Sequence, residues 1–298
     1  MAFLGIDIGG TFIKYAYEGD PIKTGKVFVK DIVEEGDREA LLETIVEIFE
    51  NHQAEALGVA VAGLVDKKSG IITDSPNIKP LENFNIKEEL EKRLNIPVFV
   101  ENDATLAAYG EFLYGAGKGS EILICLTLGT GLGGGGVING ILLTGISGSA
   151  MEIGHMTIDK NGWVCHCGRK GCLEAYVSSY GLERIYFFKT DKHIPSSEII
   201  LYANEGKKEA LETFEEFSKY LAYGLMNILH VFNPDRILLA GGIPEHYPAV
   251  VEMAVSDLKH LAFPLPFRDV DIKLASLGEF SGAYGALGYA KTRGGKNG

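Results

Sequence analysis

Three cysteines fall within eight residues near the middle of the chain. They are Cys165, Cys167 and Cys172, and His155 precedes the first of them by ten positions. Three thiols and one imidazole make up the ligand set of a closed, four-coordinate zinc site. His166 lies inside the same loop and is the alternative fourth ligand. The spacing therefore predicts a structural zinc site of the Cys3His type.

Carboxylates flank this cysteine loop and also occur upstream of it. Glu152 and Glu174 lie on either side of the predicted zinc ligands, so a bound metal would also fix these two carboxylates in space. Asp103, preceded by Asn102, stands where an apolar strand-like run gives way to a helix-like one, so its carboxylate would project into a cleft. The alternative is that Asn102 or Asp103 only caps the helix N-terminus.

Three glycine-rich turns each follow an apolar run. Paired glycines leave backbone amides unobstructed, and a turn of such amides cradles an anion. Asp7, just before the first turn, could hold a hydrated Mg²⁺. A tight hairpin or a flexible linker is the alternative for any one turn, but ligands gather at strand ends in α/β proteins, so three such turns together predict a phosphate-bearing ligand. The residues are Gly9, Gly10 and Thr11; Gly129, Thr130 and Gly131; and Gly241 and Gly242.

Strand-like and helix-like segments alternate along the chain, and they must position these side chains. The glycine-rich stretch 128–136 reads as a loop between two strands. Alternation in both halves predicts an α/β protein of two lobes with a cleft between them. Apolar runs predict strands at 2–8, 12–17, 22–29, 57–62, 97–100, 121–128, 137–138, 141–143, 236–240 and 270–274, and helical spacing predicts helices at 37–51, 87–94, 103–112, 207–232, 245–261 and 281–291.

Composition limits the class of protein. The 298-residue chain is 46% hydrophobic and 23% charged, as in a soluble globular protein, and its formal net charge is -12. A phosphate backbone rewards clustered Lys and Arg, so we expect no nucleic-acid partner. No apolar stretch of about twenty residues occurs, so we expect no membrane span. The first residues read as a strand rather than a signal peptide, and clustered cysteines are unlike a disulfide framework, so we expect a cytoplasmic protein.

Together these motifs resemble the ROK family of kinases and repressors, within the superfamily of sugar kinases, actin and chaperone ATPases. The resemblance runs from Asp7-Ile8-Gly9-Gly10-Thr11 to Ala240-Gly241-Gly242, and its most specific part joins Glu152-Ile153-Gly154-His155 to the cysteine loop. It implies an α/β, two-lobed ribonuclease H-like (actin-like ATPase) fold with an interlobe cleft. The implied small lobe is 1–110, with the helix at about 281–298 packed back on it, and the large lobe is 111–280, with a zinc loop at 155–172.

The resemblance also implies an activity, namely ATP-dependent phosphorylation of the 6-hydroxyl of a hexose, with glucose as the expected substrate. Asp103 would be the general base. Mg²⁺ would accompany the nucleotide, and zinc would be structural. By the same resemblance the sugar ligands would be Asn77, Asn102, Asp103, Glu152, His155 and Glu174; the nucleotide site would contain Asp7, Gly9, Gly10, Thr11, Gly129, Thr130, Gly131, Gly241 and Gly242; and zinc would bind His155, Cys165, Cys167 and Cys172.

Several alternatives stay open at this point. The substrate could be fructose, mannose, N-acetylmannosamine or N-acetylglucosamine, the donor could be polyphosphate, and a homodimer is implied by resemblance only. A sugar-sensing regulator of the same family would carry a DNA-binding domain ahead of the first strand, which here starts at residue 2. The chain also departs from the family pattern: Phe12 replaces the usual basic residue, with Lys14 the nearest lysine, and Met151 replaces a small residue.

Overall fold

The computed structural model describes residues 2–75 and 78–295 and contains two five-stranded mixed sheets with the same strand order. In each sheet three strands run antiparallel and two further strands add in parallel. Asn77 lies outside the described residues. The first sheet is ordered β3 (Lys23–Phe28), β2 (Phe12–Tyr17), β1 (Phe3–Ile8), β4 (Ala56–Val61) and β7 (Val98–Asn102); the second is β10 (Ile141–Leu142), β9 (Leu132–Ile138), β8 (Ile122–Leu128), β11 (Arg236–Ala240) and β12 (Asp271–Leu274).

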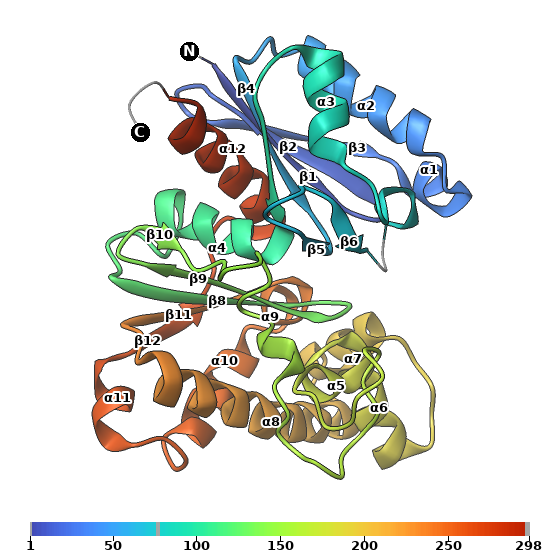
Figure 1. Cartoon of the computed structure of the whole chain (residues 1–298). Coiled ribbons are helices and arrows are strands. Elements are labelled where there is room, and N and C mark those ends of the chain that lie inside the picture. The colour runs from blue at the N-terminus through green and yellow to red at the C-terminus, as the bar shows by residue number, and fades with distance from the viewer. Residues whose placement is uncertain (1, 76–77, 296–298) are drawn as a thin grey trace.

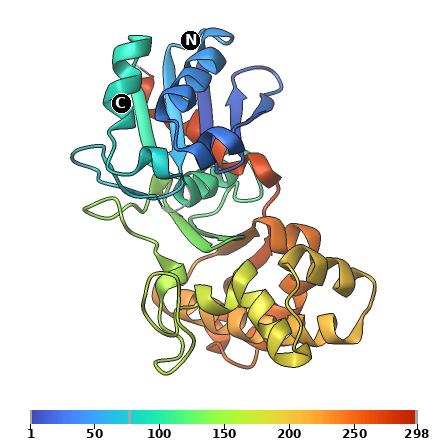
Figure 2. The same ribbon diagram turned by 90° about the vertical axis from the view of Figure 1, so that its right-hand side faces the viewer.

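Helices cover both faces of each sheet, as Figures 1 and 2 show. The first sheet has α1 (Lys30–Glu35), α2 (Arg38–Glu50) and α3 (Ile86–Leu94) on its outer face and α12 (Ser281–Gly294) on its inner face. The second sheet has α4 (Asp103–Tyr114) on its inner face. Its outer face carries α5 (Glu174–Val177), α6 (Ser179–Thr190), α7 (Ser196–Asn204), α8 (Lys208–Phe232) and α10 (Ala249–Leu258). The short helices α9 (Gly242–His246) and α11 (Pro264–Asp269) belong to the connection between β11 and β12. A separate two-stranded sheet pairs β5 (Leu64–Val65) with β6 (Ile72–Asp74).

The helices α4 and α12 pack against each other between the two sheets. Small residues allow the close approach: a Cβ at Gly110 of α4 would lie 2.3 Å from the Ser281 carbonyl oxygen, and one at Gly5 of β1 would lie 2.1 Å from the Leu287 nitrogen. Side chains in close-packed interiors have no room to shift by such amounts. The two sheets are therefore joined through a helix pair that depends on glycine, and the carboxyl ends of β1, β7, β8 and β11 are brought near one another.

Most predicted elements are confirmed, including the long helix α8, whose buried Phe214, Phe217, Leu221 and Leu225 follow one helical stripe. The predicted helix 245–261 is interrupted, because Pro248 has no amide hydrogen to continue α9 into α10. Helices α5, α6 and α7 were not predicted. None of the described helices combines the length and the apolar character that a bilayer span requires.

The prediction of a loop over the glycine-rich stretch 128–136 is wrong for most of that stretch, because β9 begins at Leu132 and its glycines pair with β8. Close packing on both faces explains those glycines. A Cβ at Gly133 would lie 2.7 Å from the Cβ of Ala104 on α4, and one at Gly134 would lie 2.5 Å from the Met151 carbonyl oxygen. Only the turn before Leu132 remains a loop, so the glycines of β9 bring α4 close to the sheet.

Candidate active site

Two adjoining cavities lie where the strands of both sheets end. The larger has a volume of about 760 Å³ and the smaller about 320 Å³. Both are lined by Lys14, Asp103, Ala104, Thr127 and Gly241, so they form one continuous cleft with two compartments. A cleft at the carboxyl ends of strands is the usual ligand site of an α/β protein.

Asn102 and Asp103 stand at the join between β7 and α4, as predicted. Asn102 caps the helix: its Oδ1 accepts a hydrogen bond from the Thr105 amide at 3.0 Å. Its Nδ2 donates to the Gly63 carbonyl and to Oδ1 of Asp103, both at 3.0 Å. The capping role thus belongs to Asn102, while Asp103 lines both compartments and is oriented by its neighbour.

Burial raises the pKa of two carboxylates in this cleft. It raises the pKa of Asp103 to about 6, with hydrogen bonds from Ala104 and Asn102 opposing the shift and the charge of Glu152 adding to it. It raises the pKa of Asp7 to about 7, with a further rise from the Asp103 charge and a decrease from the Lys14 charge. A carboxylate whose pKa approaches neutrality is a better proton acceptor than an ordinary aspartate, so Asp103 suits a general base.

The four predicted zinc ligands converge. One ligand atom from each of His155, Cys165, Cys167 and Cys172 lies within 4.8 Å of the others. His155 Nδ1 is 3.8 Å from Cys165 Sγ, and the Cys167 and Cys172 sulfurs are 3.6 Å apart. Ligands about 2.3 Å from a tetrahedral zinc ion would be separated by about 3.8 Å, so this donor set fits the metal. His166 instead stacks on Tyr180, with ring centroids 3.9 Å apart, and is not part of the cluster.

Glu174 connects the zinc loop to the second glycine turn. Its Oε2 accepts a hydrogen bond from the Leu132 amide at 3.0 Å, and its Oε1 accepts one from the Tyr180 hydroxyl at 3.2 Å. Cys165 Sγ lies 3.4 Å from the same Oε1. A Cβ at Gly131 would lie 2.7 Å from Oε2, so a larger residue there would displace the carboxylate. Glu174 is thereby held at the wall of the larger compartment.

Glu152 directly precedes a short 3-10 turn, Ile153–His155, and His155 ends it; both side chains line the larger compartment. The turn lies tight against β9, because a Cβ at Gly154 would be 2.2 Å from the Leu132 carbonyl oxygen. Met151, just before it, has a φ of 70°, a left-handed conformation that favours glycine. This is the position where the family pattern has a small residue.

The predicted nucleotide residues divide into those that line the cleft and those that do not. Gly129, Thr130, Gly131 and Gly241 line the larger compartment, and Asp7, Gly241 and Gly242 line the smaller one. The turn of Gly9, Gly10 and Thr11 joins β1 to β2 but lines neither cavity. Several other residues that line the cleft were not predicted from the sequence, namely Lys14, Thr127, Arg169, Glu245, His246 and Glu279. Of these, Lys14 could have been placed on the inner face of the sheet from the alternation of side chains along β2.

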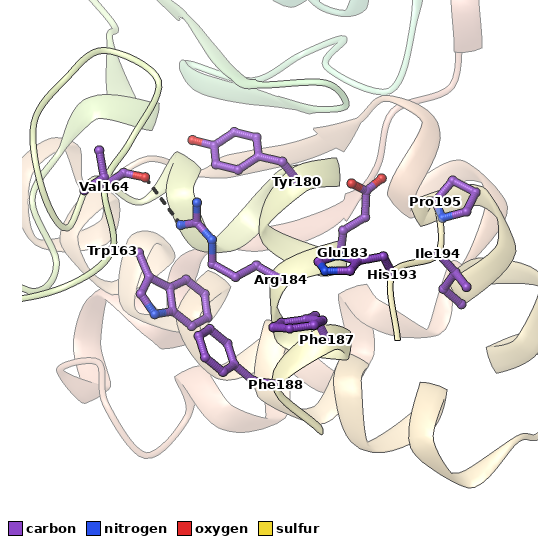
Figure 3. Close-up of a pocket in the computed structure, with 10 residues that line it drawn as sticks. All are labelled: Trp163, Val164, Tyr180, Glu183, Arg184, Phe187, Phe188, His193, Ile194 and Pro195. Atoms are coloured by element: carbon purple, nitrogen blue, oxygen red, sulfur yellow. Dashed lines mark hydrogen bonds between the residues drawn. The ribbon is translucent and has the colours of Figure 1, made fainter. Parts of the chain in front are cut away.

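A third hollow of about 720 Å³ lies on the outer side of the zinc loop, against α6 (Figure 3). Its walls are mainly aromatic and aliphatic, and its Arg184 and Glu183 side chains are engaged within the protein. Arg184 Nη1 donates to the Val164 carbonyl at 3.3 Å, and Glu183 Oε1 accepts from the Ser196 amide at 2.8 Å. None of the predicted site residues lines it. The polar chemistry therefore belongs to the two-compartment cleft.

The chain is similar to several known proteins. A glucokinase of Thermotoga maritima is 33% identical over 261 residues, 82% of this chain and 82% of the relative. A xylose repressor of Bacillus subtilis is 35% identical over 229 residues, 77% of this chain and 59% of the repressor. A crystal structure of a ROK family glucokinase from Streptomyces griseus, in complex with glucose and AMPPNP, is 31% identical and superposes with a TM-score of 0.85 over 98% of this chain and 100% of that one.

That superposition confirms the predicted two-lobed, actin-like α/β fold. The match to the family itself extends over residues 3–293, from the first strand to the last helix. It includes both sheets, the cysteine loop and every residue that lines the cleft. The chain therefore belongs to the ROK family.

Proposed function

We propose that this protein is a hexose kinase that transfers the terminal phosphoryl group of ATP to the 6-hydroxyl of its sugar, with glucose as the preferred substrate. The observation that carries the proposal is the convergence of Asn102, Asp103, Glu152, His155 and Glu174 on one compartment that continues into a second one beside Asp7. The relatives named glucokinase, and the S. griseus structure with glucose and AMPPNP, support the same reading.

In this mechanism Asp103 accepts the proton of the sugar 6-hydroxyl as that oxygen attacks the γ-phosphorus. The new bond joins the sugar oxygen to phosphorus, the bond between the γ-phosphorus and its bridging oxygen breaks, and ADP leaves with that oxygen. Phosphoryl transfer depends mainly on positioning and charge neutralisation. The hydrogen bond from Asn102 Nδ2 to Asp103 Oδ1 at 3.0 Å fixes the carboxylate for this step.

Glu152 and Glu174 accept hydrogen bonds from the sugar hydroxyls, and an analogue without those hydroxyls would lose these contacts. His155 directs Nδ1 at the cysteine cluster, 3.8 Å from Cys165 Sγ, which leaves its other ring nitrogen to donate to the sugar. Zinc, when bound by the four ligands, supplies rigidity rather than reactivity, because a closed site has no open position. Asn77 remains a proposed sugar contact.

The nucleotide would lie along the glycine turns that line the cleft, Gly129 to Gly131 and Gly241 with Gly242. Asp7 offers the carboxylate oxygen that Mg²⁺ prefers, and the ion, when bound with the nucleotide, neutralises phosphate charge. Gly9, Gly10 and Thr11 would reach the phosphates only if the lobes close on the ligand. We also propose that residues 1–110 form the small lobe and residues 111–280 the large lobe, and that the protein assembles as a homodimer.

A second function, sugar sensing by a repressor, is suggested by the xylose repressors among the relatives. Turnover distinguishes this function from that of a kinase, because a sensor binds sugar without transferring phosphate. The formal net charge of -12 disfavours DNA binding by this chain, because affinity for a phosphate backbone depends on cationic side chains.

The test is a coupled assay with a panel of hexoses and N-acetylhexosamines, run with ATP and with polyphosphate. We expect the highest kcat/KM with glucose and ATP. Asp103→Ala should lose transfer by about 10²–10⁴-fold while still binding glucose, because only the proton acceptor is removed. Full activity of Asp103→Ala would refute the assignment of Asp103 as the general base. Absence of phosphoryl transfer to every sugar in the panel would refute the proposed kinase activity.

A further inference from the structure

Glu111 is a buried carboxylate that the proposed mechanism does not use. It lies in the last turn of α4 and is 0% exposed, and it lines neither compartment of the cleft. Acidic side chains are almost never buried this completely unless they are paired, because burial removes their hydration. The protein must therefore supply hydrogen-bond donors to both oxygens of Glu111.

The donors come from two segments that are far apart along the chain. Oε1 of Glu111 accepts hydrogen bonds from the Ser276 and Leu277 amides, at 2.9 and 2.7 Å. Oε2 accepts one from the Ala116 amide at 2.8 Å and one from the Ser276 hydroxyl at 3.3 Å. Hydrogen bonds to an ionised acceptor are stronger than those between neutral groups. One side chain therefore joins α4, the turn that follows it, and a segment 165 residues further on.

The segment that Oε1 holds is the path by which the chain returns from the second sheet to the first. Residues 275–280 lead from β12 to α12, which packs on the first sheet. The opposite crossing is at Asp103, where β7 runs directly into α4. By binding the amides of the return path, Glu111 fixes that path against the helix that begins with the proposed base.

The residues that follow Leu277 form a wall of the smaller compartment. Four of the residues 278–282 line it, and Ala107, one turn before Glu111, lines it from α4. A Cβ at Gly282 would lie 2.6 Å from Oδ2 of Asp7, so the same wall lies against the proposed Mg²⁺ ligand. None of the residues 278–282 lines the larger compartment. Glu111 therefore fixes the nucleotide side of the cleft and not the sugar side.

This wall has a second anchor at the surface. Glu279 accepts a hydrogen bond from Lys26 at 2.9 Å. The two side chains are 43% and 41% exposed, and ion pairs in such positions contribute little to stability. The buried carboxylate of Glu111 is therefore the stronger anchor.

We propose that Glu111 is a positioning residue for the phosphate donor, whose carboxylate holds the wall formed by residues 278–282 in the conformation that receives an adenine nucleotide. The proposal rests on the proposed kinase function and concerns its nucleotide compartment. Glu111 acts through the wall and contacts neither the sugar nor the reacting atoms. A released wall would have to be ordered by the nucleotide on binding. If the wall were in place about a tenth of the time, the nucleotide would bind about tenfold more weakly.

The experiment measures nucleotide and sugar binding separately in Glu111→Ala. We expect the calorimetric Kd of AMPPNP and the KM of ATP to rise about tenfold, while the KM of the sugar changes little. Glu111→Gln should recover most of the nucleotide affinity, because its carbonyl oxygen can still accept from the Ser276 and Leu277 amides. A residue that only stabilised the fold would not separate the two substrates in this way.

The matched control is Asp235→Ala. Oδ1 of Asp235 also accepts two backbone amides, those of Glu121 and Ile122 at 3.1 and 2.6 Å, but it lies at the start of β11 and lines neither compartment. Asp235→Ala should lower Tm and leave the Kd of AMPPNP unchanged. If Glu111→Ala fails to fold, Gly115→Ala makes the same comparison, because its Cβ would lie 2.1 Å from Oε2 of Glu111 and displace the carboxylate.

The outcomes distinguish this proposal from the proposed function. An active parent protein with the same Kd of AMPPNP in Glu111→Ala and Asp235→Ala removes only the role of Glu111, and so does a sugar KM that rises as much as the KM of ATP. A parent protein that binds AMPPNP but phosphorylates no sugar removes the kinase, and the Kd comparison still decides the role of Glu111. A parent protein that does not bind AMPPNP removes both.

Discussion

The hydroxyl of Tyr180 donates a hydrogen bond of 3.2 Å to Oε1 of Glu174, and the same hydroxyl lies 3.6 Å from Cys165 Sγ. One side chain of α6 therefore contacts both a proposed sugar ligand and a proposed zinc ligand. Because Glu174 also accepts the Leu132 amide, each oxygen of its carboxylate has a partner in the protein. The orientation of Glu174 is thus set by α6 and β9 before any sugar binds.

Tyr180→Phe should weaken the sugar site without removing a residue that contacts the sugar. Hydrogen bonds to charged groups contribute about 1.5–3 kcal/mol, so we expect kcat/KM for the sugar to fall about 10–100-fold, mostly through KM. The matched control is Tyr223→Phe, on the exposed part of α8, which should leave the sugar KM unchanged. Equal KM values in the two variants would mean that Tyr180 does not orient Glu174.

The rate should depend on pH through Asp103. The protonated acid cannot accept the sugar proton, so kcat/KM should rise with pH through the free-enzyme pKa of about 6 and reach a plateau above it. Burial is the main cause of the raised pKa, so the acid limb should lie well above the range of an ordinary aspartate. A pH–rate profile measured in overlapping buffers at constant ionic strength tests this, and a limb near pH 4 would contradict it.

Asp7 should reduce the stability of the free protein at neutral pH. Its pKa rises from 3.8 to about 7, so the folded state holds its proton more tightly than the unfolded state does. The destabilisation is absent below pH 3.8, grows as pH rises towards 7, and is complete above 7, where it reaches about 4 kcal/mol.

Asp7→Asn removes this titration and should therefore be more stable than the parent at pH 8. The gain should shrink as the pH falls towards 4. Urea unfolding of both proteins across this pH range, without Mg²⁺, measures the difference. A difference in unfolding free energy that does not vary with pH would show that Asp7 is not desolvated as the structure indicates.

Zinc removal should affect the sugar compartment more than the nucleotide compartment. Cys172→Ser removes one of the four converging ligands, so we expect loss of bound zinc, a lower Tm and a raised sugar KM, because His155 and Glu174 depend on the loop. ADP binding should change little. Cys125→Ala is the control, since Cys125 is buried in β8 outside the cluster and should leave zinc content unchanged.

The zinc loop could be predicted from the sequence because its ligands lie close together along the chain, and α8 could be predicted because its apolar residues repeat with helical spacing. Asp103 could be placed because a strand leads directly into a helix at that point. Each of these inferences needs only local information.

The two-compartment cleft could not be predicted in the same way. Lys14, Thr127 and Glu279 come together only because two sheets meet through the α4–α12 helix pair, and no short sequence window contains that contact. The strand β9 was missed for a different reason. Glycines carry no side-chain pattern, so a strand made of them is indistinguishable from a loop until the neighbour that requires them, α4, is in place.

That explanation of β9 can itself be tested with Gly135→Ala. A Cβ at Gly135 would lie 2.5 Å from the Ala104 carbonyl oxygen and 2.6 Å from the Ala108 Cβ, both on α4. Overpacking of this kind typically costs about 1–3 kcal/mol, and the backbone contact places Gly135→Ala at the upper end. Since Asp103 begins α4, a displaced helix should also lower kcat. The stability control is Gly129→Ala, where an added Cβ meets nothing within 4 Å, and equal unfolding free energies for the two variants would refute this account of the glycine strand.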